Sequence, residues 1–523
     1  MDYAEVYRCI QVLKAKPVLF FRKENIVEKL ECFDTIQKIG SPSVISSLVE
    51  FLRSENGQIR AKAAETILFL FIKLKSLNEY ESTLKSLPIK TNDLDFYRID
   101  FEEEIYVQLL CIASLNSNGY VREKAVRELG RMKNVVGLKF ILFRLGDWVT
   151  QVRKAATEAI DLYLDRTYTD ELLKQLPTIN WLLVVERVDL REVYNRITDF
   201  ILSQDLSEEF YLKIKQLDDK ARFYFFKTFL SNFPSSEHLS WLMGDKNFLV
   251  RLELVKHLSN LNEVTQKELI ARLLSDQSAR VRLEALYASK RFSPDFEEQI
   301  ILLLSDESAS VRELSRHLLK GKGLDFAALY RQRIEGKQFL PGSLLGLSET
   351  GNSEDVPIFE QYINANNSKL VVACLSAINK FDEVKAKHYS LKLLVHPINQ
   401  VREKAVVVLA KSGDTETLEK IRNIYAIGNA EIKKSVLKLF GKIGGWYIVG
   451  DLLLALTDDN IEIQNLSWQL LYKWKLKAIR LFTTPPKKEI ERANEIYQNL
   501  EIINLRITQG RKELLQDLKL YLR

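Results

Sequence analysis

The sequence is poor in the residues that end regular secondary structure. Only 20 of its 523 residues are Gly and 11 are Pro, roughly half the usual share. Sandwiches, barrels and propellers need frequent turns, so this composition disfavours them, and it excludes collagen-like and disordered chains. A chain of this length would ordinarily form three or four domains separated by linkers rich in Gly and Pro. Such linkers are scarce here, and the composition favours long stretches of helix.

Cysteine and long apolar runs are also scarce. Cys9, Cys32, Cys111 and Cys374 lie far apart and form no C-x-x-C pair, which argues against a disulfide framework or a zinc knuckle. The longest apolar run, residues 67–72, is far shorter than the roughly 20 residues that cross a bilayer. The N-terminus shows no secretory signal pattern. These absences predict a soluble, cytoplasmic protein.

Sequence patterns of catalysis are missing as well. None of the five histidines is followed by Glu, and no two are spaced at i, i+4. The chain contains no H-E-x-x-H, no G-x-S-x-G, no phosphate-binding loop and no dinucleotide fingerprint. The net charge of +6 is spread over a long chain and does not by itself identify a nucleic-acid binder. We therefore expect no catalytic residues, no metal, no cofactor and a protein that is not an enzyme.

A repeat of about 31 residues runs along the chain. Each clear copy has an aliphatic residue, then Arg, then apolar or small residues at helical spacing. The arginines of the six clear copies are Arg122, Arg153, Arg251, Arg282, Arg312 and Arg402. They are separated by 31, 98, 31, 30 and 90 residues, close to one or three multiples of the repeat. Weaker copies fill the gaps and bring the total to about fourteen units.

Each unit also contains a second apolar segment of helical period, such as residues 136–147 or 267–276. A unit is thus two helices of about 12 residues joined by a turn. One such hairpin cannot bury its apolar face alone, so neighbouring units must complete the core. The sequence predicts an all-α fold, an α-solenoid of about fourteen two-helix repeats.

The pattern D-x-x-x-x-V/I-R-x-x-A resembles the HEAT repeats, especially the short E-Z type found in bilin-lyase-like proteins. Four pairs have the Asp six residues before the Arg: Asp147 with Arg153, Asp245 with Arg251, Asp276 with Arg282, and Asp306 with Arg312. The resemblance implies a structural ladder of these side chains along the stack. Independently of the family, an Asp at the turn can accept N–H groups of the second helix. An Arg can form a bidentate pair with a carboxylate of the same or the next unit.

The pattern is incomplete in several copies. Arg is replaced at Leu340, Val371, Lys433 and Gln464, and Asp is replaced by Asn116 and His396. We therefore expect the ladder to be weak at both ends of the chain and interrupted near residues 340–371.

The repeats divide the chain into five predicted regions. These are N-terminal HEAT-like repeats at 1–76, a degenerate unit or loop at 77–100, central HEAT repeats at 101–338, C-terminal HEAT repeats at 339–484, and capping or docking helices at 485–523.

One segment, residues 465–488, contains no acidic residue. Its candidate partner-binding or nucleic-acid-binding residues are Tyr472, Lys473, Trp474, Lys475, Lys477, Arg480, Lys487 and Lys488. Basic residues interleaved with aromatic ones suit a phosphate backbone with stacked bases, an anionic membrane surface or an acidic protein. The alternative is that this segment is simply the exposed end of the last repeat.

These features favour a non-catalytic scaffold or adaptor that binds a macromolecule, with a protein as the expected partner, along the concave solenoid surface. The alternative is nucleic-acid binding through residues 472–488. A third hypothesis is an enzyme: a bilin lyase using Cys32 or Cys374, or a DNA glycosylase, because residues 145–160 with Trp148 look superficially similar to the helical-repeat alkylpurine glycosylases. Both cysteines occupy a position that is Ala in other copies, which is also what a small core residue would do.

Overall fold

The structure, a computed structural model, describes residues 3–15, 25–204, 206–232, 238–478, 486–502 and 509–522. These residues form 33 α-helices, with short turns and 3-10 helices between them, and no β-strand. The predicted all-α solenoid is confirmed. In this part of the chain no helix combines the length and the apolar character that crossing a membrane requires.

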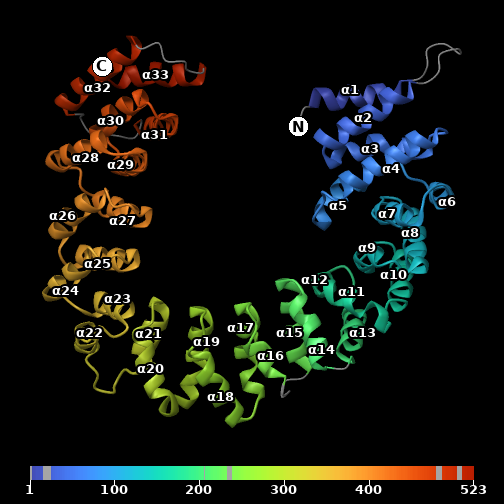
Figure 1. The fold of residues 1–523 in the computed structure, drawn as a ribbon, viewed down its shortest axis with the longest axis horizontal. Coiled ribbons are helices and arrows are strands. Elements are labelled where there is room, and N and C mark those ends of the chain that lie inside the picture. The colour runs from blue at the N-terminus through green and yellow to red at the C-terminus, as the bar shows by residue number, and fades with distance from the viewer. Residues whose placement is uncertain are drawn as a thin grey trace. The chain divides into compact units, whose positions relative to one another are not determined.

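The chain divides into two compact units, residues 1–262 and 263–523, and each is a stack of helix pairs (Figure 1). The helices of the first unit are α1 (Tyr3–Lys14), α2 (Ile26–Ile39), α3 (Ile45–Leu48), α4 (Gly57–Phe71), α5 (Leu77–Leu84), α6 (Thr91–Asp100), α7 (Glu103–Ala113), α8 (Gly119–Met132), α9 (Val135–Leu145), α10 (Thr150–Asp161), α11 (Thr169–Lys174), α12 (Leu176–Trp181), α13 (Arg191–Leu202), α14 (Glu208–Gln216), α15 (Asp219–Asn232), α16 (Leu239–Met243) and α17 (Phe248–His257). The segment 77–100 thus contains α5 and α6.

The second unit continues the same construction. Its helices are α18 (Glu263–Leu273), α19 (Ala279–Ser289), α20 (Glu297–Leu303), α21 (Ala309–Leu318), α22 (Phe326–Glu335), α23 (Leu340–Thr350), α24 (Val356–Tyr362), α25 (Ser368–Phe381), α26 (Glu383–Leu393), α27 (Asn399–Leu409), α28 (Thr415–Ile427), α29 (Ala430–Ile443), α30 (Val449–Leu454), α31 (Ile461–Ala478), α32 (Lys487–Ile502) and α33 (Gln509–Tyr521).

Asparagine side chains begin many of these helices, which explains how the chain manages with so little Gly and Pro. An N-cap Asn accepts a hydrogen bond from a backbone N–H of the first helical turn, a group that the helix itself cannot satisfy. Such caps precede α4, α8, α9, α17, α25 and α29, at Asn56, Asn118, Asn134, Asn247, Asn367 and Asn429. At these six helices the turn ends in a capping side chain, which reduces the need for Gly and Pro.

Small residues allow the second helices of neighbouring units to approach closely. In unit 1, α8 packs on α10, and in unit 2, α25, α27 and α29 pack in succession. Ala125 and Ala405, at the small position of the repeat, are completely buried. A Cβ atom built on Gly130 of α8 would come within 2.7 Å of the Cβ atom of Ala159 on α10. Larger side chains at these positions would separate the helices and expose the core.

The predicted interruption near residues 340–371 coincides with a close approach between α23 and its neighbours. A Cβ atom on Gly342 would lie 1.6 Å from the backbone oxygen of Ser305, and one on Gly346 would lie 2.2 Å from the ring of Tyr330. The hydroxyl group of Tyr330 donates to the carbonyl oxygen of Leu304 at 2.8 Å. The packing of Gly346 against Tyr330 stabilises this repeat, in which the Arg of the pattern is missing.

The two C-terminal helices pack on the preceding repeat. Helix α32 packs on α30 and α33 packs on α31. Arg492 of α32 forms an ion pair with Asp451 of α30 at 2.6 Å, and Asn494 donates to the carbonyl oxygen of Leu522 at 2.6 Å. These contacts cover the end of the stack, as a terminal repeat must be covered.

Substituting Gly342 by Ala tests the close approach at α23. The added methyl group meets backbone, which cannot rotate away, so we expect the free energy of unfolding to fall by about 3 kcal/mol or more. Urea denaturation followed by circular dichroism measures the change. The matched control is Gly413→Ala, because a Cβ atom there has no neighbour within 4 Å. Equal stability of the two variants would contradict the packing described.

Candidate functional site

The best-formed polar site in unit 1 surrounds Asp147, at the turn between α9 and α10. Arg122 of the preceding unit donates two parallel hydrogen bonds to this carboxylate, from Nε and Nη2, both at 2.8 Å. Arg144 donates a third at 3.0 Å, and the backbone N–H of Val149 a fourth at 2.9 Å. Asp147 therefore joins two units and also closes the turn that starts the second helix.

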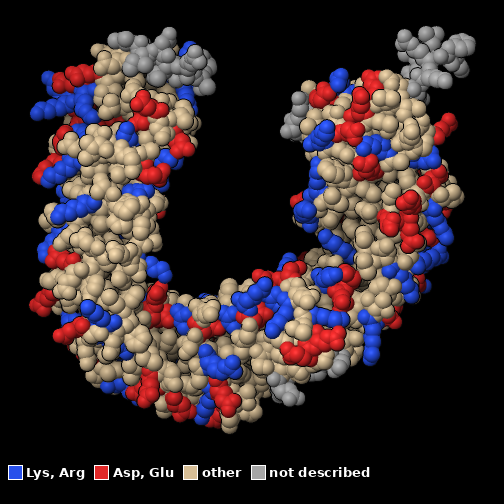
Figure 2. All heavy atoms as spheres, viewed as in Figure 1, with Lys and Arg blue, Asp and Glu red and all other residues tan. Residues whose placement is uncertain are grey.

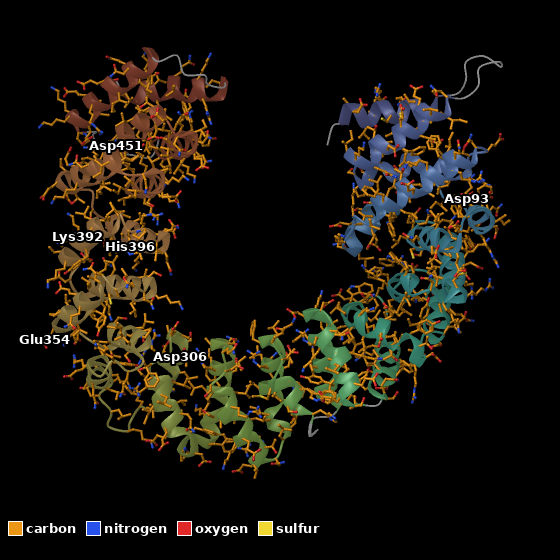
Figure 3. The ribbon with its side chains drawn as sticks, viewed as in Figure 1. Asp93, Asp306, Glu354, Lys392, His396 and Asp451 are labelled. Atoms are coloured by element: carbon orange, nitrogen blue, oxygen red, sulfur yellow. The ribbon has the colours of Figure 1, made fainter. Side chains whose placement is uncertain are left out.

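The same arrangement recurs in later repeats. In unit 1, Arg222 donates from Nε to Asp245 at 2.6 Å. In unit 2, Arg282 donates to both oxygens of Asp306, at 2.6 and 2.8 Å (Figure 3 labels Asp306). Each of these carboxylates also accepts the N–H of the residue two positions later, at 2.7 Å in both cases. The inter-unit contact is thus a repeated feature of the stack.

The six-residue spacing of the sequence pattern corresponds to a different contact. Each Arg of the pattern donates from Nη1 to the backbone oxygen of the Asp six residues before it, and not to that carboxylate. The four contacts are Arg153 to Asp147, Arg251 to Asp245, Arg282 to Asp276 and Arg312 to Asp306, at 2.8, 2.5, 2.7 and 2.7 Å. Where the structure gives a carboxylate partner for one of these arginines, it lies in the next unit.

Other residues take over the same roles where the pattern is broken. The ring nitrogen Nδ1 of His396 receives the N–H of Ile398 at 3.1 Å, as an Asp would. Gln464 donates to the backbone oxygen of Asp458 at 2.7 Å, and Lys433 forms an ion pair with the Asp458 carboxylate at 2.7 Å. The expected weakening at the C-terminal end is therefore smaller than the missing arginines suggest.

Two acidic ladder residues escaped the sequence pattern. Asp458 could have been found, because it precedes Gln464 by the six residues of the repeat. Glu349 could not, since it lies on α23 outside the pattern, yet it accepts from Arg312 and Arg316. It supplies the carboxylate where no Asp is available.

Burial and hydrogen bonding act in opposite directions on the pKa of Asp147. Desolvation acts to raise its pKa, but the hydrogen bonds from Arg122 and from the Val149 N–H outweigh it, so the pKa lies below its ordinary value. The neighbouring Arg144 shows the opposite balance. Its guanidinium is 7% exposed, burial lowers its pKa, and its Nε atom is buried without a hydrogen-bond partner. Arg144 is a buried cation that its carboxylate neighbours compensate only in part.

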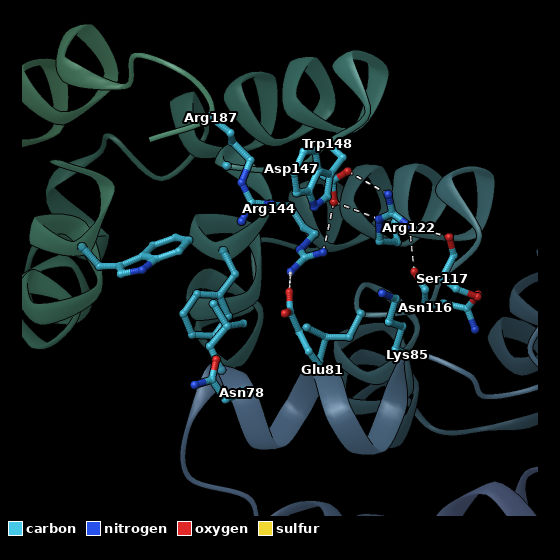
Figure 4. A pocket seen from close by; sticks show the side chains of 15 residues that line it. Asn78, Glu81, Lys85, Asn116, Ser117, Arg122, Arg144, Asp147, Trp148 and Arg187 are labelled. Atoms are coloured by element: carbon cyan, nitrogen blue, oxygen red, sulfur yellow. Dashed lines mark hydrogen bonds and ion pairs between the residues drawn. The ribbon is translucent and has the colours of Figure 1, made fainter. Parts of the chain in front are cut away.

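A cavity of about 470 Å³ opens beside these residues (Figure 4). Its walls come from α5, α8, α9 and α12 and from the turns that follow α5, α7, α9 and α12, and include Glu81, Lys85, Arg122, Phe143, Arg144, Asp147, Trp148, Trp181 and Arg187. The guanidinium of Arg187 lies 4.4 Å from the ring centre of Trp148. Trp181 meets Phe143 edge to face at 5.8 Å. The sequence did not single out this cavity, because its walls come from segments up to about a hundred residues apart.

The basic-aromatic segment at the C-terminal end is less basic in space than in sequence. Trp474 is buried and donates from Nε1 to the backbone oxygen of Gly445 at 2.6 Å. Lys475 forms an ion pair with Asp517 of α33, and Lys487 with Glu491 of α32 at 3.9 Å. Tyr472, Lys473, Lys477 and Lys488 are exposed, and Arg480 lies outside the described residues. Figure 2 shows acidic and basic side chains interspersed over this end of unit 2.

The two cysteines considered as nucleophiles are buried. Burial, with a contribution from a hydrogen bond to Cys9, raises the pKa of Cys32 to about 12, and burial raises the pKa of Cys374 to about 12. Both thiols are protonated at neutral pH, and the thiolate is the reactive form. Within the described residues, no group of three or more His, Cys, Asp or Glu could hold a metal ion.

Comparison with known proteins finds similarity only among solved structures. No family model matches the chain, and no curated protein matches its sequence. Among solved structures, the karyopherin Kap121p bound to the extreme C-terminus of the protein phosphatase Cdc14p is similar at 13% identity and a TM-score of 0.33, over 98% of this chain and 64% of that chain. Kap121p bound to RanGTP gives 12% identity and a TM-score of 0.34, over 99% and 63%. Kap95p, from a study of RanGDP, gives 11% and 0.31, over 98% and 82%.

The chain is an α-solenoid of two-helix repeats, and the assignment of these repeats to the HEAT family stays a prediction. The chain spans 61% to 64% of the length of the first Kap121p structures, and a correspondence this loose says nothing about partners. The short E-Z subtype indicated by the sequence pattern stays a prediction.

The inter-unit role of Asp147 is tested by Asp147→Asn. The amide keeps the shape but leaves two buried guanidinium groups without their carboxylate, so we expect the free energy of unfolding to fall by about 3 kcal/mol. Urea denaturation at pH 7 measures it. Asp189→Asn is the control, because Asp189 pairs with Arg191 on the exposed surface and should change nothing measurable. A neutral Asp147 variant would contradict the ladder.

The stability difference between wild type and Asp147→Asn should also depend on pH. Because the folded-state pKa of Asp147 is lowered, its stabilisation is fully present above the ordinary carboxyl value of about 4 and is lost as the pH falls through the folded value. The stability difference between wild type and Asp147→Asn should therefore shrink below about pH 4. A difference that stays constant between pH 7 and pH 3 would contradict this.

Thiol reactivity tests the cysteine assignments. All four cysteines are free and buried, so we expect a thiol reagent such as dithionitrobenzoate to label the native protein at least a hundredfold more slowly than the urea-unfolded protein. Rapid native labelling that Cys32→Ala or Cys374→Ala abolishes would instead reveal a reactive thiol and revive the lyase hypothesis.

Proposed function

We propose that this protein is a non-catalytic scaffold that binds a partner protein on the surface of its helical repeats. The observation that carries the proposal is the extent of that surface. A compact monomer of 60.6 kDa would expose about 19,500 Å², whereas this chain exposes 28006 Å². A standard protein interface takes only about 800 Å² from each partner, so the excess provides room for large or multiple contacts.

The polar groups that could suggest catalysis have structural roles instead. Asp147 is saturated by Arg122, Arg144 and a backbone N–H, so it is not a free general base. Cys32 and Cys374 are buried, and burial raises the pKa of both thiols. Both facts support binding over the lyase and glycosylase hypotheses.

Nucleic-acid binding through residues 472–488 has less support. Trp474 is not available for stacking, and Lys475 is paired with Asp517 of α33. A strand of nucleic acid needs basic side chains that follow its phosphates and aromatic ones that stack on its bases, so these two contacts weaken the case for it.

Affinity capture distinguishes protein binding from nucleic-acid binding. We expect the tagged full-length protein to retain its protein partner after nuclease treatment, with the yield unchanged within twofold. Lys473→Glu/Lys477→Glu should behave as wild type, and so should the control Lys38→Glu/Arg166→Glu, whose exposed side chains lie in unit 1. Loss of the captured material on nuclease treatment, together with loss in the Lys473/Lys477 variant alone, would overturn the proposal in favour of nucleic acid.

A further inference from the structure

The cavity of unit 1 carries an excess of positive charge. Four cationic side chains, Lys85, Arg122, Arg144 and Arg187, line it against two carboxylates, Glu81 and Asp147. Asp147 is already committed to Arg122 and Arg144, and Glu81 reaches Arg144 only at 3.5 Å from a half-exposed position. Among the described residues, neither Lys85 nor Arg187 has a carboxylate partner.

The excess positive charge is costly to the folded protein because one of the cations, Arg144, is buried. A buried guanidinium normally has all its donors satisfied and its charge balanced, but the Nε atom of Arg144 has no partner and its bond to Glu81 is long. An anion bound beside Arg144 is attracted to it more strongly than in water, because the surroundings have a low dielectric constant. This attraction offsets the desolvation cost of the cation. Figure 4 shows Arg144 between Glu81 and Asp147, with Arg187 on the same side of the cavity.

Three aromatic side chains, Phe143, Trp148 and Trp181, form part of the remaining wall. Trp148 is 77% exposed, held in place by the overlying Arg187, and Trp181 stands on the edge of Phe143. Such walls favour a ligand with an apolar or aromatic portion next to its charge. The volume of about 470 Å³ suits one or two side chains.

We propose that this cavity binds a carboxylate group carried by an acidic segment of the partner protein, with an apolar or aromatic residue beside it. Lys85 and Arg187, on opposite walls, receive the carboxylate together with Arg144, and the two tryptophans receive the adjoining side chain. A cavity of about 470 Å³ holds one or two side chains and no continuous chain of phosphates, which favours the side-chain carboxylate of a peptide over nucleic acid. The inference rests on the proposed function and specifies the chemistry of its partner.

The test uses fluorescence anisotropy with the full-length protein and a fluorescein-labelled peptide of four Glu-Glu-Phe triplets. We expect saturable binding that weakens at least tenfold when Gln replaces every Glu of the peptide. Lys85→Glu/Arg187→Glu should also weaken it at least tenfold. The matched control Lys38→Glu/Arg166→Glu carries the same change in charge away from the cavity and should bind within twofold of wild type. Thermal unfolding confirms that both variants are folded.

Three results would overturn the inference: equal affinity for the Glu and Gln peptides, an unaffected Lys85/Arg187 variant, or an equal loss in the control variant. Tighter binding of a labelled twelve-nucleotide oligothymidine that depends on Lys85 and Arg187 would also overturn it, in favour of nucleic acid. Failure of the proposed function looks different. In that case the peptide binds as expected, but affinity capture with the wild-type chain yields no protein partner.

Discussion

A carboxylate at the turn between the two helices of several repeats is the constraint on which the stack depends. It accepts the N–H groups that open the second helix, and it accepts the guanidinium of the unit before. The Asp147 side chain, 1% exposed, does both at once. Removing one contact leaves the others as buried, unsatisfied groups, which is more costly than the net gain of any single hydrogen bond. Turn geometry and the spacing of units are therefore set by the same atoms.

This dual role explains what the sequence could and could not predict. Helical period and the 31-residue repeat predict the all-α solenoid, because both depend on neighbours in the chain. The Asp–Arg spacing identifies the right residues, yet the carboxylate partner of Arg122 lies 25 residues away, in the next unit, where the spacing within one copy carries no information. Substitutes such as Lys433 and Glu349 are recognisable only once the units are stacked.

The cavity of unit 1 was beyond sequence reasoning for the same reason. Glu81 and Arg144 meet across 63 residues, and Arg187 reaches Trp148 from a later loop. The reverse holds for the acid-free segment 465–488. It looks like a basic patch in sequence, but Trp474 is buried and Asp517 of α33 pairs with Lys475 in space. The local charge of a repeat protein is decided by adjacent units, and the cavity of unit 1 keeps four cationic side chains against two carboxylates.

The central claim is that carboxylates couple successive units, and a double-mutant cycle on Arg282 and Asp306 tests it most directly. This pair has two hydrogen bonds, at 2.6 and 2.8 Å, and belongs entirely to unit 2. Unfolding free energies of Arg282→Ala, Asp306→Ala and the double variant should give a coupling energy of about 1 to 3 kcal/mol. Losses that add within about 0.5 kcal/mol would contradict the claim and assign the cohesion of the stack to apolar packing alone.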